Sequence, residues 1–161
     1  MTDITLKADK GYFNYRVGAI IIDDKKLLMV KDKDYPYYYS VGGRVKFGEN
    51  SEEAVLREAY EETQITFEIE RLAFIHENFF IGSFKDNKPF HEISLFFLMR
   101  QNDEVKNIKR RCNADGALHW LPLDDLARYR LFPEFFKTEL QNLKNEIGHF
   151  LTENEETVRM K

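Results

Sequence analysis

Cysteine is almost absent from this 161-residue chain, in which Cys112 stands alone. A single cysteine forms no internal disulfide, so nothing points to the oxidising compartments where disulfide frameworks occur. The first residues lack the apolar core of a signal peptide, and no apolar run reaches the roughly 20 residues needed to span a bilayer. We therefore expect a cytoplasmic protein that does not use a membrane as a partner.

The chain also lacks a strong excess of charge of one sign. Its 24 basic and 28 acidic side chains give a formal net charge of -4 and are spread along the sequence. A polymeric nucleic acid partner is not favoured, because a positive surface dominates binding to its phosphate backbone. Hydrophobic residues make up 43% and aromatic residues 14%, which is typical of an ordered globular domain.

Hydrophobic runs separated by polar turns indicate β-strands. The strand candidates are 17–22, 27–30, 65–80, 92–99 and 117–121. The first two flank Asp23-Asp24-Lys25-Lys26, a pattern that predicts a hairpin. The continuous apolar run within 92–99 suits a strand that is buried on both faces. Gly42 and Gly43 predict a loop that comes close to a ligand, because glycine permits backbone shapes closed to other residues.

Two segments carry helix signals. Asn50 can cap a helix over 52–63, with Glu53 as its capping-box partner. A second long helix is predicted from Pro133, since apolar residues recur after it at helical spacing. These residues are Phe136, Leu140, Leu143, Ile147 and Phe150. Residues 152–161 are predicted to be a polar tail, so one α/β domain is expected over 1–151.

Three carboxylates converge on the first predicted helix. Glu58 lies three residues before Glu61 and four before Glu62, so the side chains emerge about 5 to 6 Å apart on one surface. Like charges at this spacing repel, whereas a hard divalent cation such as Mg²⁺ would make the arrangement favourable. A solvated acidic helix face is the plain alternative for such a cluster taken alone.

The residues around the cluster resemble the signature of the Nudix hydrolases. That signature is Gly, five residues, Glu, seven residues, Arg-Glu, an apolar residue, any residue, Glu-Glu, any residue, Gly and an apolar residue. Here it runs from Gly43 through Glu49 and Arg57 to Ile65, with Gln64 in place of the second Gly. The order of the flanking segments resembles a Nudix-type α/β/α sandwich with a mixed β-sheet in a single domain.

The resemblance implies a role for each residue of this box. Arg57 looks like the orienting residue of the family, whose planar guanidinium pairs with Glu49 and with neighbouring carboxylates. The implied cofactor is Mg²⁺ or Mn²⁺. The implied metal ligands are Glu58, Glu61, Glu62 and the backbone carbonyl of Gly42.

The reaction implied by the resemblance is hydrolysis of the pyrophosphate in a small nucleoside diphosphate derivative, by water attack on phosphorus. Its general base stays open between Glu61 and Glu62 in the box and Glu92 outside it. Glu77 is a weaker candidate for the base. A catalytically silent Nudix domain that senses a nucleotide or a protein is the alternative, although such domains usually lose box carboxylates that are all present here.

Substrate selection is expected to come from residues outside the metal ligands. Tyr39, Arg44 and Phe80 are the leading candidates for substrate contacts, because aromatic rings can stack on a nucleobase and arginine can bind phosphate. Core packing or dimer contact is the plain alternative for each ring, and a homodimer is one expectation. Further candidates are Tyr37, Tyr38, Phe79, Phe84, Arg110 and Arg111.

Two positions depart from the family pattern. Val41 stands where many relatives have Pro, which should affect rigidity more than chemistry. Gln64 stands where the family Gly tolerates a positive φ, and a non-glycine residue there costs roughly 1 kcal/mol or shifts the helix end. Neither change touches an expected ligand.

Overall fold

The computed structural model describes residues 1–33, 35–82, 88–108, 112–113 and 116–153. Within these ranges the chain forms a mixed 11-stranded sheet with few helices. The strands are β1 (Thr5–Ala8), β2 (Gly11–Ile20), β3 (Ile22–Asp23), β4 (Lys26–Lys31), β5 (Tyr38–Arg44), β6 (Ile69–Ile81), β7 (Pro89–Met99), β8 (Cys112–Asn113), β9 (Gly116–Pro122), β10 (Leu131–Phe132) and β11 (Gly148–Glu153). The helices are α1 (Ser51–Thr63) and α2 (Phe136–Glu139), with 3-10 helices η1 (Asp103–Asn107) and η2 (Leu123–Arg128).

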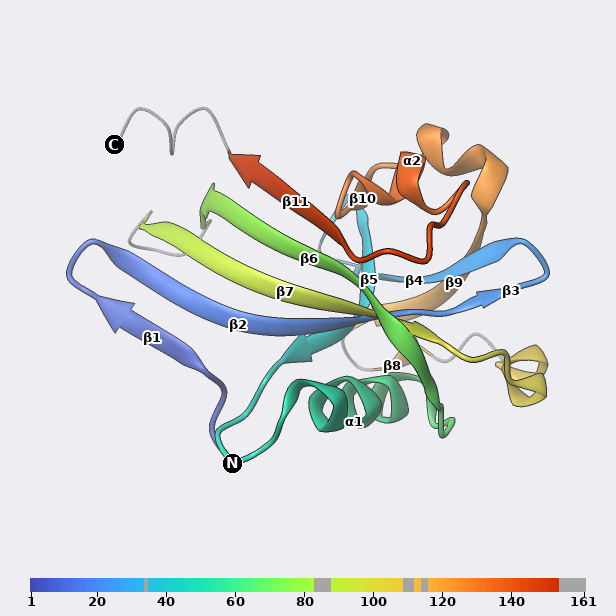
Figure 1. The fold of residues 1–161 in the computed structure, drawn as a ribbon, viewed down its shortest axis with the longest axis horizontal. Helices are drawn as coiled ribbons and strands as arrows, with labels where there is room; N and C mark the ends of the chain where they lie inside the picture. Colours follow the sequence, from blue (N-terminus) through green and yellow to red (C-terminus); the bar gives the residue numbers. More distant parts are fainter. Residues whose placement is uncertain (34, 83–87, 109–111, 114–115, 154–161) are drawn as a thin grey trace.

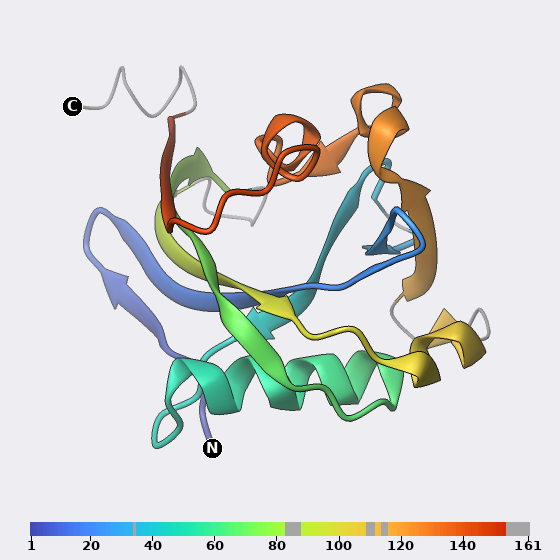
Figure 2. The ribbon, with the colours of Figure 1, turned by 45° about the vertical axis from the view of Figure 1, so that its right-hand side comes forward.

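Helices cover the sheet on two sides (Figures 1 and 2). On one side α1 buries Ala54, Val55 and Ala59 against Val17 and Val41. On the other side α2 and η2 contribute to a second core cluster whose buried members include Ile20, Phe96, Leu126 and Phe136. The predicted single-domain α/β fold with a mixed sheet is confirmed. None of the described helices is long and apolar enough to cross a membrane.

Strand β5 joins the two halves of the sheet and leaves one of its edges open. Residues 41–44 pair antiparallel with β2, whereas Tyr39 and Ser40 pair with β4 and Tyr38 and Tyr39 with β10. Beside residues 42–44, the edge that faces away from β2 therefore has no partner strand in the described part of the chain. The paired glycines were predicted in a loop, but they lie within β5 next to this open edge.

The predicted first hairpin is confirmed, and its strands are joined by a tight turn. Asp23 pairs with Lys26, so Asp24 and Lys25 form a two-residue turn. Both turn residues have positive φ, 44° and 57°, as a type I′ turn requires because its twist matches that of the flanking strands.

The predicted second long helix is wrong. Only Phe136–Glu139 is α-helical, and Gly148–Glu153 instead forms β11, which pairs parallel with β6. Two causes favour the strand: β6 would otherwise present an unpaired edge, and the absence of a side chain at Gly148 leaves room for the Phe74 and Phe150 rings. Four of the five stripe residues still reach the second core cluster, while Ile147 is 53% exposed. The strand also continues through Thr152 and Glu153, two residues into the predicted tail.

Strand β11 has a consequence for stability in acid through His76. This ring is buried, and its Nε2 lies 2.9 Å from Thr152 Oγ1 of β11. Burial lowers the pKa of His76 from 6.5 to about 4. Below pH 6.5 the unfolded chain therefore binds a proton at His76 more strongly than the folded protein does. The free energy of unfolding is highest above pH 6.5 and decreases as the pH falls to about 4.

We expect the wild-type free energy of unfolding to fall by about 3 kcal/mol between pH 6.5 and pH 4 through His76. Urea unfolding at a series of pH values measures this loss, and His76→Gln should remove it from the pH dependence of the free energy of unfolding. His149→Gln, a change at an exposed ring, is the control. Equal slopes for His76→Gln and wild type would contradict the assignment.

Candidate functional site

Helix α1 begins as the sequence predicts and carries the acidic cluster. The Asn50 side chain accepts a hydrogen bond from the Glu53 amide, and the Glu53 carboxylate accepts one from the Asn50 amide, both at 2.9 Å. This capping box fixes the first turn. It thereby sets the rotation of the helix, with Ala54, Val55 and Ala59 inward and the carboxylates at the open edge of β5.

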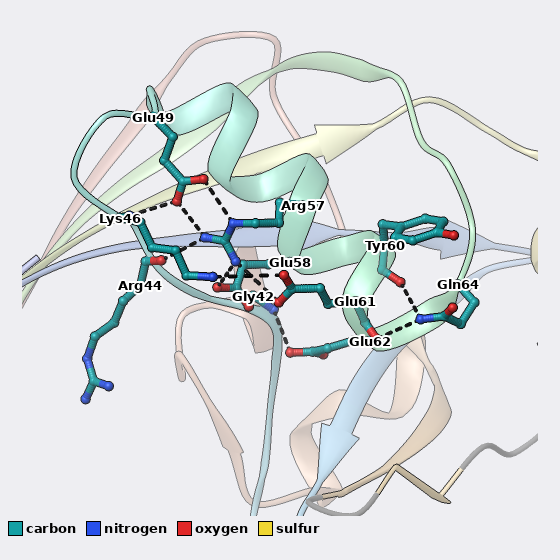
Figure 3. Close-up of polar contacts among 10 residues, drawn as sticks. All are labelled: Gly42, Arg44, Lys46, Glu49, Arg57, Glu58, Tyr60, Glu61, Glu62 and Gln64. Carbon is teal, nitrogen blue, oxygen red and sulfur yellow. Dashed lines mark hydrogen bonds and ion pairs between the residues drawn. The ribbon is translucent and has the colours of Figure 1, made fainter. Parts of the chain in front are cut away.

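Arg57 links the acidic residues into one network (Figure 3). Its Nε donates to Glu49 Oε2 at 2.9 Å and its Nη2 to Glu49 Oε1 at 2.6 Å, a bidentate pair. Nη1 donates to Glu58 Oε1 at 2.7 Å and to Glu61 Oε2 at 3.3 Å, while Nη2 also donates to the Arg44 carbonyl. Hydrogen bonds from Arg57 lower the pKa of Glu49, and those to Glu49 raise the pKa of Arg57.

Replacing Arg57 with lysine is expected to lower the free energy of unfolding by about 1 to 2 kcal/mol, because an ammonium group cannot reproduce the fork on Glu49. Arg57→Ala should cost more, roughly 2 to 4 kcal/mol, since it leaves the largely buried Glu49 carboxylate without its ion pair. Urea unfolding at neutral pH measures both. Arg128→Lys, at an 82% exposed side chain paired with Asp125, should change stability by less than about 0.5 kcal/mol. Equal effects at the two arginines would contradict this view of the network.

The Glu62 carboxylate is largely buried at the edge of β5. One of its oxygens accepts a hydrogen bond from the Gly42 amide at 3.4 Å. Burial raises the pKa of Glu62 to about 8, against the opposing effect of the Gly42 amide, and the neighbouring Glu58 and Glu61 add to the rise. Burial and the neighbouring carboxylates thus disfavour the charged form of Glu62 at this place beside Gly42.

The two glycines of β5 are needed for different reasons: Gly42 clears the backbone of β2, and Gly43 makes room for Glu58. Gly42 has φ +145°, and a Cβ there would lie 2.2 Å from the Val17 carbonyl oxygen. A Cβ on Gly43 would lie 2.4 to 2.5 Å from the Glu58 carboxylate atoms. Strand β5 therefore carries no side chain at the two positions where Glu58 and Glu62 approach its open edge.

Gln64 ends α1 in the left-handed conformation, with φ 60° and ψ 26°. The expected strain is thus present without a shift of the helix end. Its side chain offers a compensation that the sequence did not indicate, because Nε2 donates to the carbonyls of Tyr60 and Glu61, each at 3.2 Å (Figure 3). The Tyr60 carbonyl also accepts the backbone N–H of Gln64 at 2.7 Å, so the side chain adds most at the Glu61 carbonyl, in the last turn of the helix.

The two effects at Gln64 should nearly cancel when glycine replaces it. Gln64→Gly relieves about 1 kcal/mol of backbone strain but removes two exposed hydrogen bonds, so we expect a net change within about 0.5 kcal/mol. Gln64→Ala keeps the strain and loses the bonds, which should cost about 1 kcal/mol. Urea unfolding of the two variants measures the difference, and a gain of more than about 1 kcal/mol for Gln64→Gly would show that the side chain caps nothing.

The other expected site residues are not equally close to the cluster. Tyr39 lies in β5, and burial, aided by Glu62, raises its pKa to about 12. The Arg44 side chain points away from Arg57 (Figure 3) and pairs with Asp3 at 3.6 Å. Glu92 pairs with Asn14, four residues along β2 from the Gly18 partner of Gly42, which is roughly 13 Å.

Phe80 lies farther still from the cluster. It stacks on Phe90, which pairs with Tyr12, six residues along β2 from Gly18 and so roughly 20 Å away. The structure therefore brings the box residues together but does not bring Phe80 to them. The candidates Phe84, Arg110 and Arg111 lie outside the described residues.

Two basic residues that the sequence did not single out lie near the cluster. The Lys46 amide donates to Glu49 Oε1 at 2.7 Å, and its ammonium group approaches Glu61 at 4.0 Å. Arg16, in the middle of β2, approaches Glu92 at 3.8 Å, and its charge is also close enough to Glu62 to oppose the rise in the pKa of that carboxyl. The sequence position of each residue could have identified it as a candidate. Lys46 lies within the box, and Arg16 is a charged residue directly before an apolar strand run.

Comparisons with known proteins match the fold over most of the chain. The crystal structure of the Bacillus halodurans mutator MutT protein matches with a TM-score of 0.65 and 19% identity, over 88% of this chain and 92% of that one. A MutT NUDIX hydrolase from Burkholderia pseudomallei matches with a TM-score of 0.62 and 25% identity, over 82% and 98%. Both likenesses confirm the predicted Nudix-type fold.

Sequence similarity is more local among curated proteins. A Bacillus subtilis (strain 168) protein with the provisional name 8-oxo-dGTP diphosphatase is 46% identical over 52 residues, 30% of this chain. The match spans 35% of that relative's length. The NUDIX domain family, by contrast, matches residues 13–140, most of the chain. The chain therefore belongs to the Nudix hydrolase family.

Proposed function

We propose that this protein is a divalent-metal-dependent pyrophosphohydrolase that acts on a small nucleoside diphosphate derivative. The observation that carries the proposal is the complete set of box carboxylates assembled around Arg57 beside the open edge of β5. A sensor domain would not need all four of Glu49, Glu58, Glu61 and Glu62. A plain acidic helix face would not need an arginine that bonds three of them.

The residues at this edge fit a hard divalent cation. Glu58, Glu61 and Glu62 offer carboxylate oxygens, the donors that Mg²⁺ and Mn²⁺ prefer, and the absent side chain of Gly43 leaves a cradle around Glu58. A bound cation would favour the charged form of Glu62 and so oppose the effect of burial, which raises the pKa of this carboxyl. The N–H and C=O of a strand residue point to the same edge, so the Gly42 carbonyl is expected beside Glu62.

Binding a cation requires some rearrangement of these side chains. Within the described ranges no three His, Cys, Asp or Glu side chains converge closely enough to hold an ion. Arg57 Nη1 occupies an oxygen of Glu58 and one of Glu61. Since Glu61 is 52% exposed, its carboxylate can rotate toward Glu62 and Glu58.

The chain's own residues have distinct tasks in this proposal. Glu58 and Glu62 hold the cation at the β5 edge, and Arg57 with Glu49 keeps Glu58 in place. Bound Mg²⁺ would neutralise phosphate oxygens and lower the pKa of a bound water. The buried Glu92 carboxylate accepts a hydrogen bond from Asn14 and lies along the sheet from the cluster, which favours a general base from within the box.

The test is a product screen with Mg²⁺, with Mn²⁺ and with excess chelator. It covers nucleoside and deoxynucleoside triphosphates, ADP-ribose, dinucleoside polyphosphates, nucleotide sugars and NADH. The name of the Bacillus subtilis relative makes 8-oxo-dGTP the first compound to assay. We expect metal-dependent release of a nucleotide product from at least one class.

Two outcomes would overturn the proposal. Nucleotide binding without turnover across the panel would favour the sensor function. Turnover that persists in excess chelator would remove the metal from the reaction. The cytoplasmic location and the homodimer stay predictions.

A further inference from the structure

Two arginines lie directly opposite each other on neighbouring strands. Arg16 of β2 and Arg44 of β5 are register partners in the antiparallel pair, so their side chains leave the same face of the sheet about 5 Å apart. Like charges in this position repel each other. Both side chains are 36% exposed. Such a pair is better suited to an anion than to an empty protein surface.

Arg16 is held by residues that are themselves buried. Glu92 Oε2 lies 3.8 Å from Arg16 Nη1 and accepts a hydrogen bond from Asn14 Nδ2 at 3.2 Å. Asn14 Oδ1 in turn accepts a hydrogen bond from Thr5 at 2.9 Å. Asn14 is 2% exposed and Glu92 8%. Glu92 is thus fixed from the β2 side and presents its charge to Arg16.

The two guanidinium groups retain donors for a ligand. The approach to Glu92 is the one polar contact of the Arg16 guanidinium in the described residues, and it involves only Nη1 of a group that carries five N–H donors. Arg44 pairs with Asp3 at 3.6 Å, and its Nε is buried without a hydrogen bond among the described residues. Each guanidinium group thus faces a single carboxylate at a long distance, which leaves N–H donors for a ligand.

The pair lies beside the carboxylate cluster. Arg44 is two residues along β5 from Gly42, roughly 7 Å, and Gly42 donates to Glu62. The Arg44 carbonyl accepts a hydrogen bond from Arg57, while its side chain points away from that network (Figure 3). The Arg16 charge also opposes the rise in the pKa of Glu62 that burial causes. A ligand at the open edge of β5 can therefore reach both groups.

We propose that Arg16 and Arg44 bind a phosphate group of the substrate, and that Glu92 and Asn14 position Arg16. This inference rests on the proposed function, because it concerns the same substrate. It assigns Glu92 to positioning and not to proton transfer. It also names a substrate class: with a phosphate-binding pair roughly 7 Å from Gly42, nucleoside triphosphates and longer polyphosphates fit better than nucleotide sugars.

The first test needs no catalysis. Binding of inorganic tripolyphosphate is measured by calorimetry in excess chelator, for wild type, Arg16→Ala, Arg44→Ala and the control Arg128→Ala. We expect each of the first two variants to weaken binding by about tenfold to a hundredfold, and the control to bind like wild type. Thermal unfolding checks that each variant folds, and Arg44→Ala serves if Arg16→Ala does not. Unchanged binding by a folded variant would overturn the inference.

The second test uses steady-state kinetics on a hydrolysed triphosphate. Arg16→Ala should raise KM by about tenfold or more while kcat stays within about fivefold, and Arg16→Lys should recover part of the loss. Glu92→Gln should raise KM by less than Arg16→Ala does, because Arg16 loses its charged partner, and should lower kcat by far less than the hundredfold or more that loss of a general base costs. A kcat loss of that size at Glu92 would overturn its positioning role.

The two proposals fail separately. If no compound is hydrolysed but tripolyphosphate binding depends on both arginines, the hydrolase proposal fails and the anion site stands. If hydrolysis proceeds and neither arginine affects KM or anion binding, the hydrolase proposal stands and the anion site fails.

Discussion

Replacing Glu62 with glutamine is expected to reduce turnover of any hydrolysed panel compound by about a hundredfold to a thousandfold. Glutamine keeps the shape and one oxygen, so the Gly42 amide still has an acceptor. It removes the charge that a cation would need. Because burial raises the Glu62 pKa to about 8, the metal-free fold already holds this carboxyl largely protonated at neutral pH, and Glu62→Gln should unfold at nearly the wild-type temperature.

A second readout separates metal binding from catalysis. Mg²⁺ at about a hundred times its Kd should stabilise the wild type by about 2.7 kcal/mol, and Glu62→Gln should lose most of that gain. Glu52→Gln is the matched control, since Glu52 is an exposed carboxylate of the same helix. Normal turnover by Glu62→Gln, or an equal loss in Glu52→Gln, would contradict a metal site at the end of α1.

The sequence predicts the acidic cluster well because one helix carries it. Asn50 and Glu53 fix where α1 begins, and helical geometry then determines which way Glu58, Glu61 and Glu62 point. The link between Arg57 and Glu49 is also predictable, because the resemblance of this stretch to the Nudix signature implies it. Each of these contacts depends on a short stretch of chain.

Contacts between distant segments are harder to predict. The stripe after Pro133 has helical spacing, yet β11 forms because β6, more than 70 residues earlier, offers an edge to pair with. Glu92 has the chemistry of a general base, but Asn14, 78 residues away, determines which way its carboxylate is held. The pairing of Arg16 with Arg44 depends on a strand register that no local pattern encodes. Local spacing therefore predicts which carboxylates of α1 share a surface, whereas strand pairing determines what surrounds them.

The strongest contrast in the site should come from two neighbouring alanine substitutions. Gly43→Ala is expected to reduce turnover by about a hundredfold and to change the free energy of unfolding by less than about 1 kcal/mol. The new Cβ would overlap the Glu58 carboxylate, the end of a flexible side chain that can swing away. Gly42→Ala should instead destabilise the fold by about 3 kcal/mol or more, because φ is +145° and the Cβ would meet the Val17 backbone.

Gly48→Ala separates the two reasons why Gly42→Ala should destabilise the fold, the positive φ and the overlap with the Val17 backbone. Gly48 also has a positive φ, +95°, but a Cβ there meets only the Met1 sulfur at 3.9 Å. It should therefore show the backbone cost alone, about 1 kcal/mol, with normal turnover. Urea unfolding and kcat measured on all three variants give the comparison. If Gly43→Ala retained full turnover, Glu58 would not need its place against β5, and the proposed metal site would lose the ligand that the missing side chain accommodates.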